Sequence, residues 1–269
     1  MRIASIGAAT VAFGSPVWSV SADALWTHGV THVSLLCALI AIKKGKAGGA
    51  ALWFGISVLT RPHLIVVPLI LTLFRLDRRV LLGGVAGGLA GLGLSGLYSL
   101  VVFGRIIPSG GYNVDGLSQS APLRSAAGLA GNIWDWLADP LHGIVVWVPL
   151  ALIAAVGVPL VWRNLDPLIR AAAVAGMAYA AAQLSLIRAS GGNIFLGHRT
   201  TIETFVLATP LIVASLWALM SSSRAARVLI STLIAYSVAI HAYAAWIDMH
   251  PFVREFIEDL QSRMRSDQS

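Results

Sequence analysis

The sequence predicts an all-α, polytopic integral membrane protein, and two observations carry that prediction. Of the 269 residues, 57% are apolar and 12% are charged, and the mean hydropathy is +0.78. Soluble domains carry about 25% charged residues, because a folded soluble chain needs a polar surface. The second observation is a series of apolar runs that could cross about 30 Å of hydrocarbon. Together these features exclude an ordinary soluble enzyme.

About nine apolar segments are predicted to be transmembrane helices. They cover residues 3–20, 29–42, 47–60, 63–74, 80–103, 143–162, 171–187, 201–220 and 228–247. We expect one transmembrane domain over residues 1–247, followed by an external amphipathic tail at 248–269. The first segment has a second interpretation, because Arg2, an apolar run and the small residues at 20–22 are also typical of a cleavable signal peptide.

The basic residues between these segments predict the orientation in the membrane. One side carries 11 of the 19 Lys and Arg residues but two of the 12 acidic residues. Apart from Arg2, its basic residues are Lys43, Lys44, Lys46, Arg75, Arg78, Arg79, Arg163, Arg170, Arg224 and Arg227. Cytoplasmic loops carry an excess of Lys and Arg. We therefore expect a multi-pass protein of the bacterial inner membrane with a cytoplasmic N-terminus and an extracytoplasmic C-terminus. All seven histidines then lie outside the membrane or in the outer half of a span.

Two of the predicted segments, 47–60 and 63–74, are short and meet at Arg61-Pro62. A single helix over 47–74 would bury Arg61 at mid-membrane, which costs at least about 2.5–3.5 kcal/mol. Proline also disfavours helix at the residue before it. The sequence therefore favours a tight hairpin with its tip at the outer surface.

Glycines recur every four residues in segment 80–103, as in Gly83, Gly87 and Gly91. No Lys-Ser/Thr pair follows and no strand precedes them, so a phosphate-binding loop is not indicated. Small residues at this spacing in a membrane helix predict close packing against a neighbouring helix.

Two further helices are predicted to lie along the membrane surface. In the external loop 104–142, apolar residues recur at helical spacing from Leu123 onward. The loop also contains Trp134 and Trp136, and tryptophan is enriched at membrane interfaces. In the tail, residues 252–264 show apolar side chains at helical spacing.

Polar residues gather in five clusters on the predicted outer side. They are Asp23, Trp26 and His28; Arg61 and His63; Asn113 to Asp115; Asp135, Asp139 and His142; and Arg188 through Asn193 with His198, Arg199 and Glu203. Arg61 follows the predicted segment 47–60 and Arg199 precedes the segment 201–220, so each sits at the end of a span, where an arginine can bind a phosphate with two hydrogen bonds. A coupled transporter is less favoured, because only His32 and Gln183 come near the membrane interior.

No metal site and no other cofactor are predicted, although a divalent metal is possible. His28 and His32 are four residues apart on one helix and could be a ligand pair, but no third ligand has diagnostic spacing. Cys37 is the only cysteine, which excludes a disulfide framework and a cysteine-based metal cluster.

Four fragments, in order, resemble bacterial GT-C-type glycosyltransferases, the polytopic enzymes related to protein mannosyltransferases and lipid A aminoarabinose transferases. Gly14-Ser-Pro-Val-Trp18 with Ala24-Leu-Trp26-Thr-His28 resembles their "TPxW…LWxH" segment, and Leu59-Thr-Arg-Pro62 resembles "LTRP". Ala138-Asp-Pro-Leu-His-Gly143, running into Val146-Trp-Val-Pro149, is similar to "DPxxGLxxYSP". Gly191-Gly192 with Gly197-His198-Arg199 is similar to "GG…GPRY". The resemblance covers about residues 14–210.

The resemblance implies transfer of a sugar from a polyprenyl-phosphate donor at the extracytoplasmic face. Arg61 and Arg199 match the motif arginines and are expected to bind the donor phosphate. His28 and Asp139 match polar motif positions and, with Asp23, are the candidate catalytic residues. The residues expected to line the substrate cavity are Trp26, His63, Asn113, Asp115, His142, Asn193 and His198.

The chain departs from the family pattern in two places. His198 stands where the family usually has proline, and Thr200 where it usually has tyrosine. The family's catalytic acidic loop has no counterpart, since Asp23 does not map onto its acid. We therefore expect a fragment of such an enzyme, or a chain whose partner supplies that segment. The alternatives are a transporter of a lipid carrier or solute, and a non-catalytic membrane subunit.

Overall fold

The protein is a bundle of α-helices, as the sequence predicts. The computed structural model describes residues 2–21, 27–106, 125–140, 143–187, 200–248 and 255, and within these ranges it contains no strand. The helices are α1 (Arg2–Phe13), α2 (Pro16–Ser21), α3 (Thr27–Lys43), α4 (Ala47–Thr60), α5 (Val66–Leu71), α6 (Arg78–Phe103), α8 (Ala126–Ala138), α9 (Ile144–Trp147), α10 (Pro149–Val161), α11 (Pro167–Leu186), α12 (Ile202–Ser222) and α13 (Arg224–Asp248). Short 3₁₀ helices, η1 (Pro62–Ile65) and η3 (Trp162–Asn164), join some of them.

Four helices are long and apolar enough to cross a membrane, which identifies a membrane-associated protein. They are α6, α11, α12 and the part of α13 over Arg224–Ala245. The other predicted segments are helical too, but they form shorter apolar helices or helix pairs; segment 3–20, for example, is divided between α1 and α2. A crossing by all nine segments stays a prediction.

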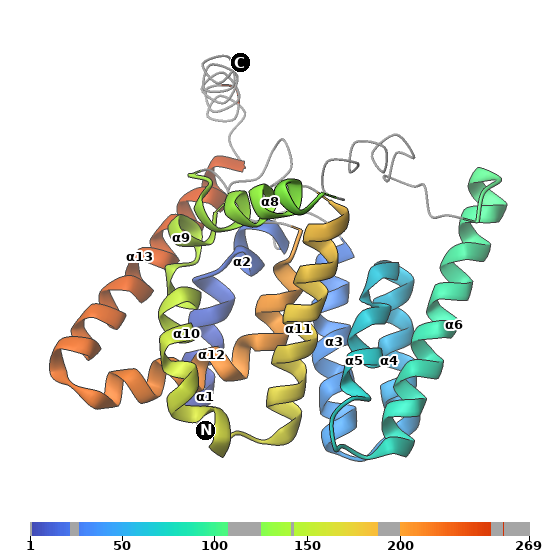
Figure 1. Cartoon of the computed structure of the whole chain (residues 1–269), viewed down its shortest axis with the longest axis horizontal. Helices are drawn as coiled ribbons and strands as arrows, with labels where there is room; N and C mark the ends of the chain where they lie inside the picture. Colours follow the sequence, from blue (N-terminus) through green and yellow to red (C-terminus); the bar gives the residue numbers. More distant parts are fainter. Residues whose placement is uncertain are drawn as a thin grey trace.

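The helix break at Arg61 agrees with the expected hairpin. Helix α4 ends at Thr60, and Arg61 has an extended backbone with φ −143° and ψ 91°. Pro62 then opens η1, where its missing N–H needs no partner. Figure 1 shows α5 running back toward the end of the bundle at which α4 began. A single helix over residues 47–74 is therefore excluded.

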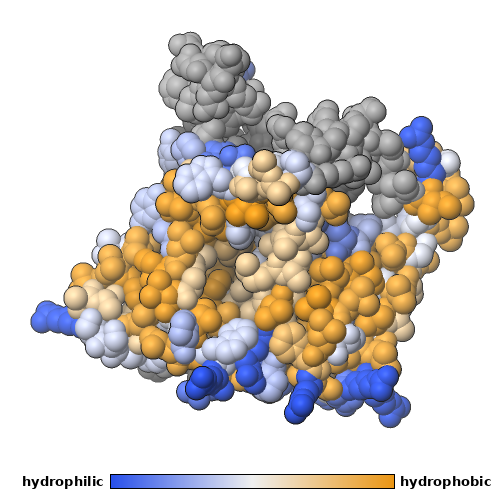
Figure 2. All heavy atoms as spheres, in the orientation of Figure 1, coloured by the Kyte–Doolittle hydropathy of each residue, from blue (hydrophilic) through white to orange (hydrophobic). Residues whose placement is uncertain are grey.

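The basic connections gather at one end of the bundle, which we call the basic end. Figure 1 shows the α3–α4, α5–α6 and α10–α11 connections together there, and Lys43 forms an ion pair with Asp166 between the first and the last of them. Figure 2 shows hydrophilic atoms along this edge, below a broad apolar surface. This is the distribution expected of helices in a bilayer, with charged residues outside the hydrocarbon.

Asp166 has two roles at the basic end. Its side chain caps α11 by accepting a hydrogen bond from the Leu168 N–H at 2.9 Å. It also pairs with Lys43, whose side chain is 64% exposed. The hydrogen bond from Lys43, and then that from Leu168, hold the pKa of the Asp166 carboxyl below its ordinary value of 3.8. Because folding lowers this pKa, ionised Asp166 stabilises the fold at pH values above its ordinary pKa of 3.8. This stabilisation is lost as the pH falls through the folded-state pKa.

Replacing Asp166 should separate these two roles. Asp166→Ala removes both the cap of α11 and the ion pair with Lys43, and it should lower the free energy of unfolding by about 1 kcal/mol. Asp166→Asn keeps a capping oxygen and should lose less, because an exposed ion pair contributes below about 1 kcal/mol. Thermal unfolding at neutral pH and at an acidic pH below the lowered folded-state pKa of Asp166 measures both. The loss caused by Asp166→Asn should shrink at the lower pH; an equal loss at both pH values would contradict the role of the ion pair.

Helices α4 and α6 pack with their backbones in close contact. A Cβ atom added at Gly87 would lie 1.9 Å from the carbonyl oxygen of Ala51, and one at Gly91 would lie 2.2 Å from that of Gly55. Only glycine allows this approach. The face of α6 that the glycine spacing marks is therefore the face that meets its neighbour, as expected of small residues four apart.

The apolar core consists of two clusters. One joins α3, α4, α5, α6 and α11, and the other joins α1, α9, α10, α12 and α13. Helix α12 belongs to both, since Leu207 lies in the first cluster and Phe205 in the second. The first turn of α12 is consequently held on both sides, and it carries Glu203.

Helix α8 lies across the end of the bundle opposite the basic end (Figure 1). Ser125 caps it by accepting from the Gly128 N–H at 3.0 Å. The buried Asn132 side chain donates to the carbonyls of Leu184 and Ile187 at the end of α11, at 2.6 and 3.0 Å. A helix in the external loop was expected from its periodicity; its position at a lipid surface stays a prediction. Of the helix expected over residues 252–264, the structure describes Glu255 alone.

Candidate functional site

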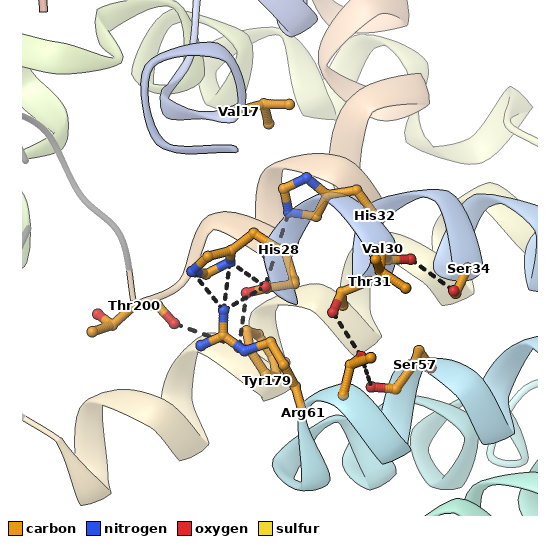
Figure 3. Close-up of polar contacts among 12 residues, drawn as sticks. Val17, His28, Val30, Thr31, His32, Ser34, Ser57, Arg61, Tyr179 and Thr200 are labelled. Carbon is orange, nitrogen blue, oxygen red and sulfur yellow. Dashed lines mark hydrogen bonds and ion pairs between the residues drawn. The ribbon is translucent and has the colours of Figure 1, made fainter. Parts of the chain in front are cut away.

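Four polar side chains from separate parts of the chain gather around one buried carboxylate, Glu203, and together with it they form a cluster of five. The five residues are His28, Arg61, His63, Tyr179 and Glu203, and we call them the Glu203 cluster. His28 lies in the first turn of α3, Arg61 follows α4, and Glu203 lies in the first turn of α12. Figure 3 shows His28, Arg61 and Tyr179 turned toward one another. Arg61 is 9% exposed and Glu203 is fully buried.

Glu203 accepts hydrogen bonds from three elements at once. Its Oε1 lies 2.8 Å from Arg61 Nη1 and 2.8 Å from His28 Nδ1, and its Oε2 accepts from the Tyr179 hydroxyl at 2.8 Å. The tautomer of His28 with its hydrogen on Nδ1 suits the contact with Glu203, because an ionised carboxylate can only accept. Arg61 Nη1 lies 2.5 Å from the same nitrogen. Carboxylate contacts of this kind are among the stronger hydrogen bonds in proteins.

The guanidinium of Arg61 is held from two further sides. Its Nη1 lies beside the imidazole of His28, 2.9 Å from Nε2, and its Nε donates to His63 Nε2 at 3.2 Å. The ring of His63 stacks on that of Tyr179, with centroids 5.5 Å apart. Arg61 and Glu203 compensate each other's charge, which a buried ion pair requires because each ion has lost its hydration.

Hydroxyl contacts fix the helices that carry the cluster. The hydroxyls of Thr31 in α3 and Thr60 in α4 lie 2.9 Å apart, which joins the helix of His28 to the residue before Arg61 (Figure 3). Thr204 donates to the Gly176 carbonyl at 2.9 Å and joins α12 to α11. This contact lies next to Glu203 in α12 and three residues before Tyr179 in α11.

A second histidine of α3 faces the same carboxylate. His32 lies one turn after His28, and its Nε2 is 3.9 Å from Glu203 Oε1. One nitrogen of each histidine and one oxygen of Glu203 lie within 4.8 Å of one another, and all three residues are buried. Glu203 is therefore a third candidate metal ligand beside His28 and His32. The spacing of residues in the sequence does not reveal it, because Glu203 lies on another helix.

The structure brings together three of the residues predicted from the sequence: His28, Arg61 and His63. Asp139 ends α8 and is partly exposed, and it is Glu203 that contacts Arg61 and His28. The remaining predicted site residues lie outside the described residues. These are Asp23, Trp26, Asn113, Asp115, His142, Asn193, His198 and Arg199.

Two residues of the cluster were not chosen as site residues from the sequence. Glu203 belongs to one of the predicted outer polar clusters and has no predicted role there, although it is the only acidic residue inside the nine predicted segments. An ionisable residue within a membrane segment indicates a functional site, so the signal was present. Tyr179 has no comparable signal, because aromatic residues are common in apolar helices. Comparison with known protein families, with curated proteins and with solved structures gave no match.

Proposed function

We propose that this chain is a membrane glycosyltransferase, or a part of one, that transfers a sugar from a polyprenyl-phosphate donor at the extracytoplasmic face. One observation carries the proposal. Arg61 and His28 come from two separate motifs of the GT-C resemblance, and both contact the same buried carboxylate, Glu203. The nine-span topology, with the basic end in the cytoplasm of a bacterial cell, is part of this proposal.

A phosphate leaving group needs a cation, and Arg61 is placed to supply one. A guanidinium can bind two phosphate oxygens at once. The second motif arginine, Arg199, directly precedes Thr200 in the sequence, and the Thr200 carbonyl oxygen lies 3.5 Å from the Tyr179 hydroxyl oxygen. The described part of the chain therefore resumes beside the cluster, at Thr200.

His28 is the group best arranged to accept the proton of the acceptor. With its Nδ1–H donated to Glu203, its Nε2 carries a lone pair that faces Arg61 Nη1 at 2.9 Å. This lone pair becomes the general base when Arg61 turns from His28 to the donor phosphate. In the proposed step, the acceptor oxygen bonds to the anomeric carbon while the bond from that carbon to the phosphate oxygen breaks. Polyprenyl phosphate leaves with the electron pair, and the acceptor proton passes to His28 Nε2. Glu203 stabilises the resulting imidazolium, as a carboxylate does for a catalytic histidine.

A transporter is the second candidate, and the same cluster favours it. Buried, paired ionisable residues within membrane helices are typical of ion and substrate pathways. The two functions differ in their products. A transporter would move a labelled polyprenyl-phosphate sugar or solute across a liposome membrane and leave it chemically unchanged, whereas a transferase releases polyprenyl phosphate.

Sugar transfer should depend on the shape of the Arg61 side chain as well as on its charge. Arg61→Lys keeps a cation near Glu203 but loses the planar fork, and should lower transfer about 100-fold, as removal of one transition-state donor does. Arg199→Ala should have an effect of the same kind. The assay uses membrane vesicles that supply acceptors and a panel of labelled polyprenyl-phosphate monosaccharides, with release of polyprenyl phosphate as the readout.

The matched control is Arg79→Ala, which removes an exposed arginine at the basic end. This variant should transfer sugar at the wild-type rate. Full activity in both Arg61→Lys and Arg199→Ala would overturn the donor-phosphate assignment. Transport without sugar release by the wild-type chain would favour the transporter.

A further inference from the structure

We propose that His28, His32 and Glu203 form a binding site for one divalent transition-metal ion of the zinc class, which takes the place of Arg61 at Glu203. The proposal rests on the geometry of these side chains and not on the proposed function. His32 has no part in the proposed phosphate binding or proton transfer, and here it becomes a metal ligand.

The ligand types and their placement suit such an ion. Two histidines four residues apart lie on one face of a helix, and a carboxylate from another helix completes three ligands, a set found in zinc sites with an open position. The His28 Nδ1 and His32 Nε2 atoms lie 2.8 and 3.9 Å from Glu203 Oε1. Ligand atoms bound to one zinc ion lie about 3.4 Å apart in a tetrahedron. Small rotations of the two imidazole rings would bring the atoms to that spacing.

The surroundings support the carboxylate as a ligand. The Tyr179 hydroxyl donates to Glu203 Oε2 at 2.8 Å, which leaves Oε1 for the ion. Hydrogen bonds to a ligating carboxylate orient it and strengthen metal binding. The three ligand residues are buried, so few water molecules compete for them.

The ion and Arg61 exclude each other at two atoms. Arg61 Nη1 donates to Glu203 Oε1, the oxygen on which the three ligand atoms converge. A metal ion on His28 Nδ1 also moves the imidazole hydrogen to Nε2, so that nitrogen can no longer accept from Arg61 Nη1, 2.9 Å away. A dication beside a guanidinium is further opposed by their like charges. Metal binding therefore releases Arg61 from the carboxylate, and removal of Arg61 favours metal binding.

Metal titration of the whole purified chain tests the proposal. The chain in detergent is treated with a chelator and titrated with Zn²⁺ against a competing chromophoric chelator. The wild type should bind one tight equivalent, and Arg61→Gln should bind it about tenfold more tightly, because the competing cation is gone. Tyr179→Phe should weaken binding by about tenfold through loss of the hydrogen bond to Glu203. His32→Gln, which keeps a polar side chain of similar size, should lose the tight equivalent.

His241→Gln is the control, because His241 is a buried histidine whose Nε2 contacts the Trp147 carbonyl at 2.8 Å in another part of the bundle. It should bind Zn²⁺ as the wild type does. Tight binding that survives in His32→Gln, or an affinity that Arg61→Gln leaves unchanged, would overturn the proposal. If His32→Gln does not fold, Co²⁺ in the wild type decides: visible absorption bands of a tetrahedral histidine site support it, and the spectrum of hydrated Co²⁺ overturns it. Sugar transfer plays no part in these readouts, so this proposal and the proposed function can fail separately.

Discussion

Glu203→Gln should lower the free energy of unfolding by about 3–5 kcal/mol, the usual cost of leaving one partner of a buried ion pair without its counter-charge. Glutamine has nearly the shape of glutamate, so the packing of α12 changes little. Arg61, however, keeps its charge in a site with 9% exposure. The measurement is unfolding of the purified protein in mixed micelles, followed by tryptophan fluorescence.

The double variant makes this expectation specific to the ion pair. Removing both charges with Arg61→Met and Glu203→Gln should restore much of the lost stability, because no uncompensated ion remains. Asp135→Asn is the control, since it neutralises an exposed carboxylate on α8 and should change stability by less than about 0.5 kcal/mol. Additive losses in the double variant would contradict a direct coupling between Arg61 and Glu203.

Gly87→Ala should destabilise the protein by about 3 kcal/mol, the upper part of the range for overpacking. The added Cβ would lie 1.9 Å from the Ala51 carbonyl oxygen. That oxygen belongs to the α4 backbone, so no side-chain rotation relieves the overlap. The two helices must separate, and they lose the contact along which α6 is attached to the bundle. The same unfolding assay measures the loss.

Gly93→Ala provides the matched control on the same helix. A Cβ atom at Gly93 meets nothing within 4 Å, and alanine is favoured over glycine in a helix by about 1 kcal/mol. This variant should therefore be as stable as the wild type or slightly more stable. Equal losses at positions 87 and 93 would show that the α4–α6 backbone contact does not hold α6 in place.

The identity and packing faces of the helices were largely predictable from the sequence, because they follow from short-range patterns. The break before Pro62 depends on the geometry of proline, and the close contact at Gly87 depends on small residues four apart on a helix. The helix at Ala126–Ala138 shows its period within one loop. The composition also predicts that the protein lies in a membrane, because a chain with so few charged residues needs a lipid bilayer around its apolar surface.

The candidate site was predictable only in part. Local motifs predict Arg61 and His28 as site residues, and the structure brings these two together, but no local motif predicts a role for Glu203, the residue that both contact. Glu203 lies 175 positions after His28 and 142 after Arg61. Spacing along one helix relates residues three or four apart; it does not predict contacts across such separations.

By itself, the sequence determined an all-helical, membrane-associated protein, the helix break at Arg61 and the glycine face of α6, because backbone sterics and burial of apolar residues act locally. The tertiary structure alone decided which charges neutralise each other. A buried arginine needs a carboxylate within hydrogen-bonding distance, and the packing of α12 between the two apolar clusters is what places Glu203 there.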